Sequence, residues 1–456
     1  MPPASAAVSC PPPSAAWPGC YRPRRVRGTV LWQVMDRWWP RFLSEYSEAL
    51  EPRYGRLRPA VRRSGGEYLR CGILDFGFAR IRCDECGAEH LLAFSCKSRI
   101  CPSCMKKRQL LFGEFLAGSI LERVSHRHVV FSIPRRLRPF FHHHRALLAG
   151  LSRSAWESLQ EALRHELGEP SGRGAAVQVV HTWGDLLDWH PHVHGLVAWG
   201  LFGTDGAYRG APPLPAGPVH DIFRLKVFGL LRRAGLVDAG LVEDMLYWPH
   251  SGFHVWLGPL VSCLEADALE QMSQYTARGP VSLERLSVVP GGEPSGSRLS
   301  WEEGGADDRG RVVCTAGKAI AKHGGDTRVF DPLQFIAELT MHVPDTHQKM
   351  ALYYGWYSNR SRGERRKRAV AAGLMPAAAP EPAPPATEAP RLSKANWARF
   401  IKKVYEADPL LCPRCSREMR IVAFIQEAPV VFRILLHLGL LGLDASAPAE
   451  RGPPGR

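Results

Sequence analysis

The stretch that most constrains the fold of this chain is Asp188–Trp199, which reads Asp-Trp-His-Pro-His-Val-His-Gly-Leu-Val-Ala-Trp. His190, His192 and His194 stand at every second position. Alternate side chains of a β-strand point to one face, so this spacing predicts a row of imidazoles on one side of a sheet. Val193 would point to the opposite, apolar face. Neutral imidazoles about 7 Å apart along one strand can hold a divalent ion, given a rise of about 3.3 Å per residue.

The apolar residues around this strand predict a sheet with helices packed on it. A strand at 177–183 precedes the histidine strand by a short turn, so the two should pair antiparallel. Further strands are expected at 128–133 and 251–256, and helices at 29–52, 110–121, 146–167 and 223–236. We therefore predict an α+β fold with an antiparallel sheet. The histidine spacing alone also fits a surface strand that binds nothing.

Two Cys-x-x-Cys pairs precede the sheet, and they predict a tetrahedral structural zinc site. The four predicted ligands are Cys83, Cys86, Cys101 and Cys104. Gly87 supplies the backbone freedom that a turn between such ligands often needs. Cys96, His90 and the more distant Cys71 are further candidates. A redox dithiol would need only one of the two pairs.

The net charge predicts a polyanionic partner. Lys and Arg number 59 against 44 Asp and Glu, which gives a formal charge of +15. Nucleic acid is the commonest partner of such a chain, whereas a membrane surface would call for a basic amphipathic helix. Lys106, Lys107 and Arg108 directly follow the second cysteine pair, and Arg360 and Arg362 begin a second basic run. We expect these five residues to contact DNA phosphates.

No segment of the sequence predicts export or membrane insertion. Residues 1–28 are rich in Pro, Ala and Ser and lack the apolar core of a secretory signal. The longest apolar run, 430–443, is interrupted by Arg433 and His437 and is too short to span a bilayer. Cysteines without a signal sequence read as metal ligands in a reducing compartment. We therefore expect a cytoplasmic protein.

Composition divides the chain into six expected parts. They are a disordered basic arm at 1–28, a zinc-binding domain at 29–123 with basic residues expected to contact nucleic acid, a large domain at 124–368 that contains the histidine strand, an Ala/Pro linker at 369–392, a small module at 393–445 and a tail at 446–456. The small module contains Cys412 and Cys415. Because only two cysteines lie in it, we interpret this pair as a vestigial metal knuckle.

A helix is predicted from Asp267 to Arg278, where Gly279-Pro280 ends it. Tyr275 lies near its end, and Arg278 lies one turn further on the same face. A tyrosine beside an arginine is most often an interface residue or a residue at the edge of a core. The pair alone therefore does not identify a catalytic group.

The order of these motifs resembles one family. The chain is similar to rolling-circle insertion-sequence transposases of the HUH (His-hydrophobe-His) endonuclease superfamily, of the insertion-sequence ninety-one kind. The motifs that carry the resemblance are the cysteine pairs, Gly184-Asp185, His190–Leu196, His250–Phe253, Tyr275–Leu286, Val329–Leu333 and Tyr353–Gly363. Each motif is weak alone, but their shared order is specific. The likeness covers residues 30 to 363 and resumes near 395.

The resemblance implies an enzyme that nicks one DNA strand and stays covalently attached to it. His192 and His194 would bind Mg²⁺ or Mn²⁺, and Tyr275 would be the nucleophile, with Arg278 or the metal favouring its ionised form. The products would be a 5′-phosphotyrosine and a free 3′-OH on single-stranded DNA at the ends of a mobile element. The resemblance also implies a catalytic domain built on an antiparallel HUH sheet, preceded by a small zinc-binding domain.

One position departs from part of the family. Some members carry a second tyrosine one helical turn before the first, and Gln271 stands there in this chain. Its carbonyl oxygen could instead be a third ligand of the catalytic metal. His190, Gln178 and His254 compete for that role.

Two alternatives remain beside the nicking transposase. A catalytically inactive DNA-binding repressor would not need two histidines together with a downstream tyrosine. A replication initiator or relaxase of the same superfamily would not be expected to carry the preceding zinc domain. The recognised DNA sequence and the oligomeric state do not follow from these motifs.

Overall fold

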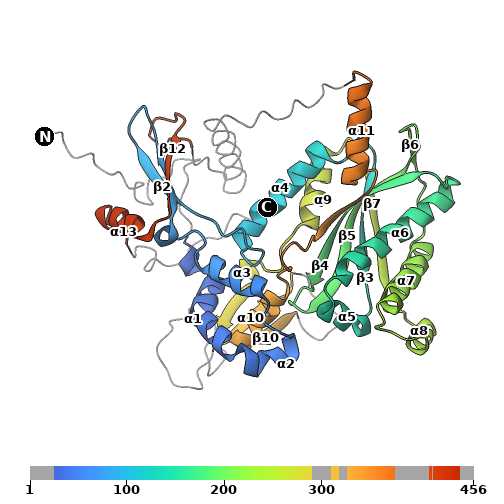
Figure 1. Cartoon of the computed structure of the whole chain (residues 1–456), viewed down its shortest axis with the longest axis horizontal. Helices are drawn as coiled ribbons and strands as arrows, with labels where there is room; N and C mark the ends of the chain where they lie inside the picture. The colour runs from blue at the N-terminus through green and yellow to red at the C-terminus, as the bar shows by residue number, and fades with distance from the viewer. Residues whose placement is uncertain (1–24, 290–309, 318–325, 375–409, 413, 442–456) are drawn as a thin grey trace. The chain divides into compact units, whose positions relative to one another are not determined.

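A computed structural model describes residues 25–289, 310–317, 326–374, 410–412 and 414–441 (Figure 1). The chain forms two compact units, and each combines segments that are remote in the sequence. The first contains residues 1–110, 281–343 and 380–456, and the second contains residues 111–280 and 344–379. The predicted basic arm and linker fall mostly outside the described residues, and the predicted tail falls wholly outside them.

This division differs from the predicted domains at two places. Residues 281–343 were expected within the catalytic domain but belong to the first unit. The predicted separate module at 393–445 also belongs to the first unit, because its strand pairs with an N-terminal strand. Sheet pairing therefore joins segments that a linear reading of the composition keeps apart.

The second unit is built on a six-stranded sheet with the order β11-β4-β5-β3-β7, and β6 pairs with the end of β5. The strands are β3 (His126–Ser132), β4 (Arg173–Trp183), β5 (Trp189–Phe202), β6 (Tyr208–Gly210), β7 (His254–Val261) and β11 (Ala351–Gly355). All of these pairings are antiparallel. The predicted α+β fold and the antiparallel pairing of the histidine strand are confirmed.

One face of this sheet carries the main core of the unit. The helices of the second unit are α4 (Pro102–Ser119, from residue 111), α5 (Arg138–His143), α6 (Leu147–Leu167), α7 (Ala216–Arg233), α8 (Ala239–Leu246), α9 (Ala266–Thr276) and α11 (Asn359–Ala371). Figure 1 shows α6 and α7 along one side of the sheet. Val193 and Val197 are fully buried there with Phe131 and Phe223. Val193 thus points to the apolar face, as its place between two histidines predicts.

The opposite face of the sheet continues the row of histidines. Leu196 and Ala198 of β5 pack there with Leu116 of α4. A methyl group on Gly113 of α4 would lie 2.5 Å from Cγ of Gln274 on α9, so the two helices approach this closely only because glycine stands there. These two helices border the histidine row.

The helical part of the first unit begins at Thr29, whose side chain caps the first long helix by accepting a hydrogen bond from the backbone N–H of Trp32. The helices are α1 (Val30–Glu45), a π-helical turn (Tyr46–Leu50), α2 (Glu51–Tyr54), α3 (Pro59–Leu69) and α10 (Pro332–Met341). Leu31, Val34 and Trp38 are buried on one side of α1. The predicted helix at 29–52 is therefore present, divided by the π-helical turn.

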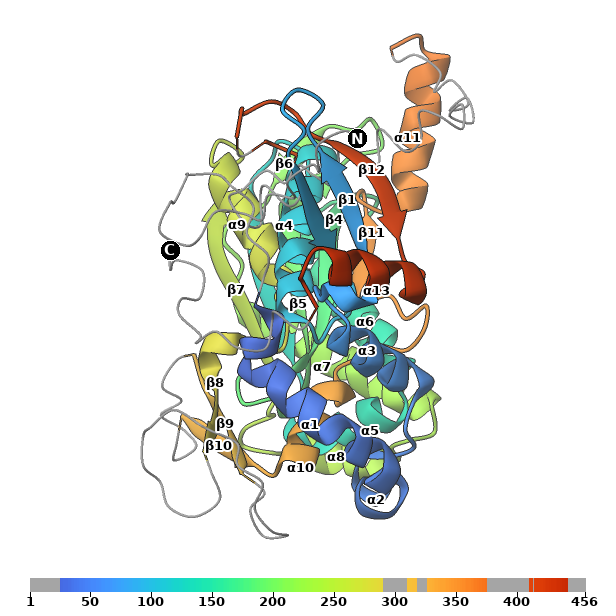
Figure 2. The same ribbon diagram turned by 90° about the vertical axis from the view of Figure 1, so that its left-hand side faces the viewer.

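Two three-stranded antiparallel sheets complete the first unit. One has the order β10-β9-β8 and consists of β8 (Leu286–Val289), β9 (Arg311–Thr315) and β10 (Thr327–Phe330). The other has the order β12-β1-β2 and consists of β1 (Phe78–Arg82), β2 (Glu89–Ala93) and β12 (Arg420–Ile425), followed by α13 (Ala428–His437). Figure 2 shows β12 beside β1.

Short 3₁₀ turns connect the larger elements at Val26–Gly28, Leu74–Phe76, Arg135–Leu137 and Leu283–Arg285. Among the described residues, none of the helices combines the length and the apolar character that crossing a bilayer requires.

Candidate functional site

A cluster of three buried histidines lies on the face of the second unit's sheet that α9 borders. His192 and His194 come from β5, and His181 comes from β4, where the strand register pairs it with His192. Each offers a ring nitrogen within 4.8 Å of the others. Nε2 of His192 lies 3.0 Å from Nε2 of His194. Nitrogens this close together can share one metal ion.

Hydrogen bonds fix how two of these rings are protonated. A carbonyl oxygen can only accept, so Nδ1 of His192 donates to the carbonyl of His190 (2.7 Å) and Nε2 of His181 donates to that of Thr276 (2.8 Å). Nδ1 of His181 is then a buried acceptor with no hydrogen-bond partner in the described structure. A buried lone pair without a partner is costly unless a ligand takes it.

His128 of β3 orients the third ring. Its Nε2 lies 2.9 Å from Nδ1 of His194, which directs Nε2 of His194 toward His192. Partners of this kind set the tautomer and the orientation of histidines that bind metals. Nε2 of His192 and Nε2 of His194 therefore face each other, and His181 offers a ring nitrogen within 4.8 Å of both, an arrangement that suits a divalent ion.

Burial keeps these imidazoles neutral. Desolvation lowers the pKa of His192 to about 3 and holds the pKa values of His181 and His194 well below their usual range. Desolvation also lowers the pKa of His128 to about 4, and the positive charge of Arg278 adds to this effect. The neutral form is the one that can donate a lone pair to a metal.

Tyr275 of α9 lies beside this cluster. Its ring centroid is 5.9 Å from that of His194 and 5.6 Å from that of His128, and the residue is 45% exposed. The guanidinium carbon of Arg278 lies 4.8 Å from the centre of the tyrosine ring. The structure therefore brings together four predicted residues, His192, His194, Tyr275 and Arg278.

The third residue of the cluster is His181, which the sequence analysis did not name, and Gln271 stays an untested prediction. Gln271 is exposed on α9, whereas His181 is fully buried next to His192. Two of the competing candidates are not members of the cluster. The amide of Gln178 lies 2.7 Å from Oγ of Ser152 on the other face of the sheet, and His254 is exposed on the edge strand β7. His190 lies next to His192, with 5.0 Å between ring centroids.

The cysteines of the first unit form two separate clusters. Within each cluster, the four sulfurs lie within 4.8 Å of one another. The first cluster consists of Cys71, Cys96, Cys101 and Cys104, and the second consists of Cys83, Cys86, Cys412 and Cys415. Sulfur–sulfur distances of 3.7 Å in the first and 3.4–3.5 Å in the second are too long for disulfides, which are about 2.05 Å. They approach the edge of about 3.8 Å of a tetrahedron with Zn–S bonds near 2.3 Å.

The predicted single site of Cys83, Cys86, Cys101 and Cys104 is thereby corrected. Cys83 and Cys86 lie in the β1–β2 turn and meet Cys412 and Cys415, so the C-terminal pair has the two further thiols that its own segment lacks. Cys101 and Cys104 lie at the start of α4 and meet Cys71 and Cys96. Two of the spare candidates are therefore members of a cluster.

Comparisons with known proteins point to one family. The family model described as "Transposase zinc-binding domain" matches residues 36–133, and the model described as "Putative transposase" matches residues 175–365. The chain belongs to the transposases of the insertion-sequence ninety-one kind. The resemblance seen in the sequence is confirmed, and the transposase carries an N-terminal zinc-binding domain and acts on DNA.

Two relatives resemble the transposase over most of their lengths. "Putative transposase y4qJ" of Sinorhizobium fredii is 26% identical over 394 residues, which cover 82% of this chain and 91% of the relative. "Transposase for insertion sequence element IS801" of Pseudomonas savastanoi pv. phaseolicola is 25% identical over 422 residues, which cover 90% of this chain and 92% of the relative. No solved structure matches the transposase significantly.

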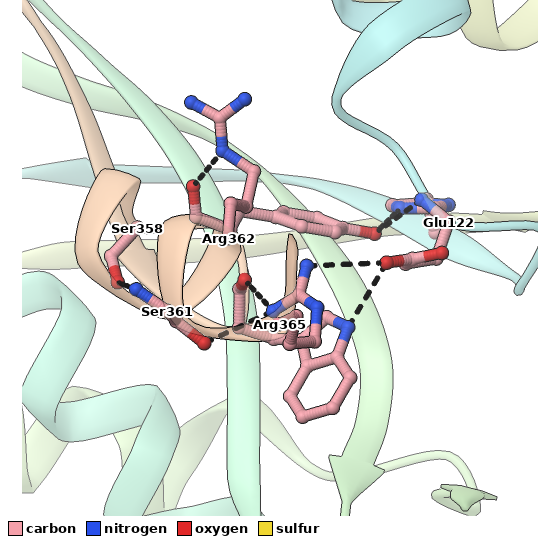
Figure 3. Close-up of polar contacts among 8 residues, drawn as sticks. Glu122, Ser358, Ser361, Arg362 and Arg365 are labelled. Atoms are coloured by element: carbon pink, nitrogen blue, oxygen red, sulfur yellow. Dashed lines mark hydrogen bonds and ion pairs between the residues drawn. The ribbon is translucent and has the colours of Figure 1, made fainter. Parts of the chain in front are cut away.

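The basic run after β11 forms helix α11, and part of it has a structural role. Arg365 lies against the Trp356 ring (4.0 Å), donates to the Trp356 carbonyl and pairs with Glu122 (Figure 3). Arg362 donates to the carbonyl of Tyr357 and to Asn359. Arg360 is paired with Glu364, although its side chain is 90% exposed. The exposed side chains of Arg366, Lys367 and Arg368 follow on the same helix.

The other predicted DNA contacts lie on the part of α4 that belongs to the first unit. Lys106 and Arg108 are exposed, and Lys107 is half-buried. These positions follow the first cysteine cluster, because Cys101 and Cys104 flank the start of the helix. The transposase therefore has exposed basic side chains in both of its units.

Three further tyrosines make contacts outside the cluster of His181, His192 and His194. Tyr354 donates to Ser152 on the other face of the sheet, and Tyr353 lies under Arg362. Tyr357 is fully buried, 2.7 Å from Nε2 of His126, and its hydroxyl accepts from the backbone N–H of Glu122. Burial lowers the pKa of His126 to about 4, so this ring is also neutral.

We expect Tyr357→Phe to lower the free energy of unfolding by about 1–3 kcal/mol, because it removes the partner of two buried polar groups. Urea unfolding measures the change. Tyr353→Phe is the matched control, since it removes a hydroxyl from a residue that is only half-buried. Equal effects of the two substitutions would show that the buried hydrogen bonds of Tyr357 do not stabilise the unit.

Proposed function

We propose that the transposase cuts single-stranded DNA at the ends of its element by attack of Tyr275 on a phosphodiester. The catalytic ion, Mg²⁺ or Mn²⁺, would be held by His181, His192 and His194. The observation that carries the proposal is the convergence of three neutral imidazoles next to an exposed tyrosine ring. We assign the third ligand to His181 in place of Gln271, because His181 is grouped with His192 and His194 and has a buried nitrogen without a partner in the described structure.

The bound ion would polarise the scissile phosphate and offset its developing charge. The chain supplies the nucleophile and its surroundings. The Tyr275 oxygen bonds to phosphorus as its proton passes to solvent water, and Arg278 stabilises the negative charge that forms on the phenol oxygen. The bond from phosphorus to the 3′ oxygen breaks, and that oxygen takes up a proton. The products are a 5′-phosphotyrosine and a 3′-OH, so the bond can be resealed without ATP.

His128 and Thr276 act as positioning residues. His128 holds Nδ1 of His194, and the carbonyl of Thr276 holds Nε2 of His181. Thr276 directly follows Tyr275, so this hydrogen bond also ties the nucleophile's helix to the metal site. A small shift of α9 would therefore disturb the ligand and the nucleophile together.

DNA binding by exposed cations supports this chemistry. We assign phosphate contacts to Lys106, Lys107, Arg108 and Arg360, with Arg366, Lys367 and Arg368 added to the predicted set. Arg362 is retained only as a residue that anchors α11. Cys71, Cys96, Cys101 and Cys104 would hold a structural zinc. A bacterial enzyme of this kind would work on the nucleoid.

The deciding experiment uses single-stranded DNA that carries one end of the element, with Mg²⁺ or Mn²⁺. We expect a nick and a protein–DNA adduct that survives denaturant. Only the fragment on the 3′ side of the nick should be attached, so a label at the 3′ end of the DNA should move with the protein. Peptide mapping should place the attachment on Tyr275. A transposase that binds this DNA but forms no adduct with any divalent ion would be the inactive repressor.

We expect His181→Ala to reduce cleavage at least about 100-fold and to weaken Mn²⁺ binding, because it removes one of three ligands. DNA binding should persist, since affinity comes mainly from phosphate contacts. Metal titration and cleavage rates measure the two effects. Gln271→Ala is the matched comparison and should cleave like the unmodified protein. If Gln271→Ala lost cleavage and Mn²⁺ binding while His181→Ala retained both, Gln271 would be the third ligand.

A further inference from the structure

The turn between β1 and β2 has the backbone geometry of a metal knuckle. The N–H of Cys83 donates to the carbonyl of Ala88 (2.8 Å), and the N–H of Gly87 donates to the carbonyl of Cys83 (3.0 Å). Gly87 has φ +71°, a left-handed conformation that favours glycine. This fold of the backbone brings the sulfurs of Cys83 and Cys86 to one side.

The segment before β12 repeats this geometry. The N–H of Cys412 donates to the carbonyl of Arg417 (2.8 Å), and the N–H of Ser416 donates to the carbonyl of Cys412 (2.9 Å). Ser416 has φ +55°, although it is not glycine. It occupies the position, four residues after the first cysteine, that Gly87 occupies in the other turn. A left-handed conformation at a non-glycine residue is uncommon and costs energy that a bound ligand can offset.

Sheet pairing places the two turns against each other. β12 runs antiparallel to β1, with Arg420 opposite Arg82 at the end where both turns lie. The sulfur of Cys83 is then 3.5 Å from that of Cys415, and the sulfur of Cys86 is 3.4 Å from that of Cys412. An ion pair between Arg420 and Asp84 also links the two turns.

We propose that Cys83, Cys86, Cys412 and Cys415 bind a second zinc ion, which fastens the C-terminal segment of the transposase to its N-terminal hairpin. Four thiolates at the corners of a tetrahedron are the ligand set that structural zinc sites use. Cys412 and Cys415 lie outside residues 36–133, where the zinc-binding family model matches. The site is also separate from the histidine cluster, so it does not rest on the proposed cleavage mechanism.

The small core around the turns explains why a metal is needed. Among the described residues, the buried apolar side chains around the cysteines are few, and they include Ala79, Ile81, Leu92, Met419 and Ile421. A module of this size buries too little apolar surface for independent stability and usually depends on a metal or on disulfides. The zinc ion would supply that stability, since its binding free energy is folding free energy.

Metal content of the full-length protein tests the proposal. We expect about two zinc ions per chain, one for each four-cysteine cluster. The double variants Cys412→Ser/Cys415→Ser and Cys83→Ser/Cys86→Ser should each contain about one zinc ion, and combining all four substitutions should remove no more. Cys263→Ser lies outside both clusters and should retain both ions. If Cys412→Ser/Cys415→Ser kept two ions, or if the unmodified chain held only one, the proposal would be wrong.

A measurement on the unmodified chain removes the concern that the variants misfold. Thiol alkylation during titration with a zinc chelator, read residue by residue by mass spectrometry, shows which cysteines become reactive together. We expect Cys83, Cys86, Cys412 and Cys415 to lose protection in one step. Loss of protection of Cys83 and Cys86 together with Cys101 and Cys104 would overturn the proposal. Disulfide-linked peptides from freshly isolated protein in place of zinc would also overturn it.

Discussion

Tyr275→Phe should abolish the covalent protein–DNA adduct, with a loss of more than about 1,000-fold in the rate of cleavage. The substitution removes the attacking oxygen and keeps the ring, which lies 5.9 Å from the ring of His194. Because the residue is 45% exposed, we expect the free energy of unfolding to change by no more than about 0.5 kcal/mol. Adduct formation on denaturing gels and DNA binding by a mobility shift are the two measurements.

Tyr354→Phe is the matched control for this experiment. Its hydroxyl binds Ser152 on the opposite face of the sheet, so the variant should still form the adduct. Both variants should bind the same DNA as tightly as the unmodified chain, because phosphate contacts come from Lys and Arg. If Tyr275→Phe still formed the adduct, another residue would be the nucleophile, and the family membership of the chain would be unaffected.

Cys71→Ser should have the largest effect on stability. We expect it to release the zinc ion of the first cluster, where the sulfur of Cys71 lies 3.7 Å from those of both Cys101 and Cys104. Structural zinc sites contribute on the order of 10–16 kcal/mol to folding, and three thiolates hold the ion far less well than four. Residues 71–104 should therefore become susceptible to proteolysis at temperatures where the unmodified chain resists.

This experiment also separates the observed clusters from the one that the cysteine spacing predicts. Cys71 is absent from the predicted set, so full zinc content in Cys71→Ser would favour the predicted grouping. Loss of about one zinc ion per chain, with the second cluster intact, would support the structure. Cys314→Ser, at a buried cysteine outside both clusters, controls for a general effect of losing a buried thiol.

Local patterns predicted the parts of the fold that depend on neighbours in the sequence. The alternation of His190, His192 and His194 placed these residues on one strand face, and helical spacing with Gly279-Pro280 placed Tyr275 at the end of a helix. The α+β class followed from the same periodicities. These features are set by side-chain period and turn chemistry, which the sequence displays directly.

Features that depend on the register between strands could not be predicted from the sequence. His181 pairs with His192 because of the register between β4 and β5. The register shifts between His181 and Trp183, so the length of the connecting turn does not predict which residue of β4 lies opposite His192. The predicted grouping of the cysteines was wrong for a related reason. The closeness of two Cys-x-x-Cys pairs in the sequence predicted one site, but the strand pairing of β1 with β12 supplies different partners for Cys83 and Cys86.

The pairing of β12 with β1 has a consequence for how the protein is made. Cys86 and Cys412 are 326 residues apart, so a ribosome adding about 5–20 residues per second needs roughly 15–65 s to make the chain between them. Throughout that interval the N-terminal hairpin has open thiols and an unpaired strand edge, which chaperones and proteases can recognise. A truncated product would keep both exposed, so closure of this sheet distinguishes a finished transposase from a fragment.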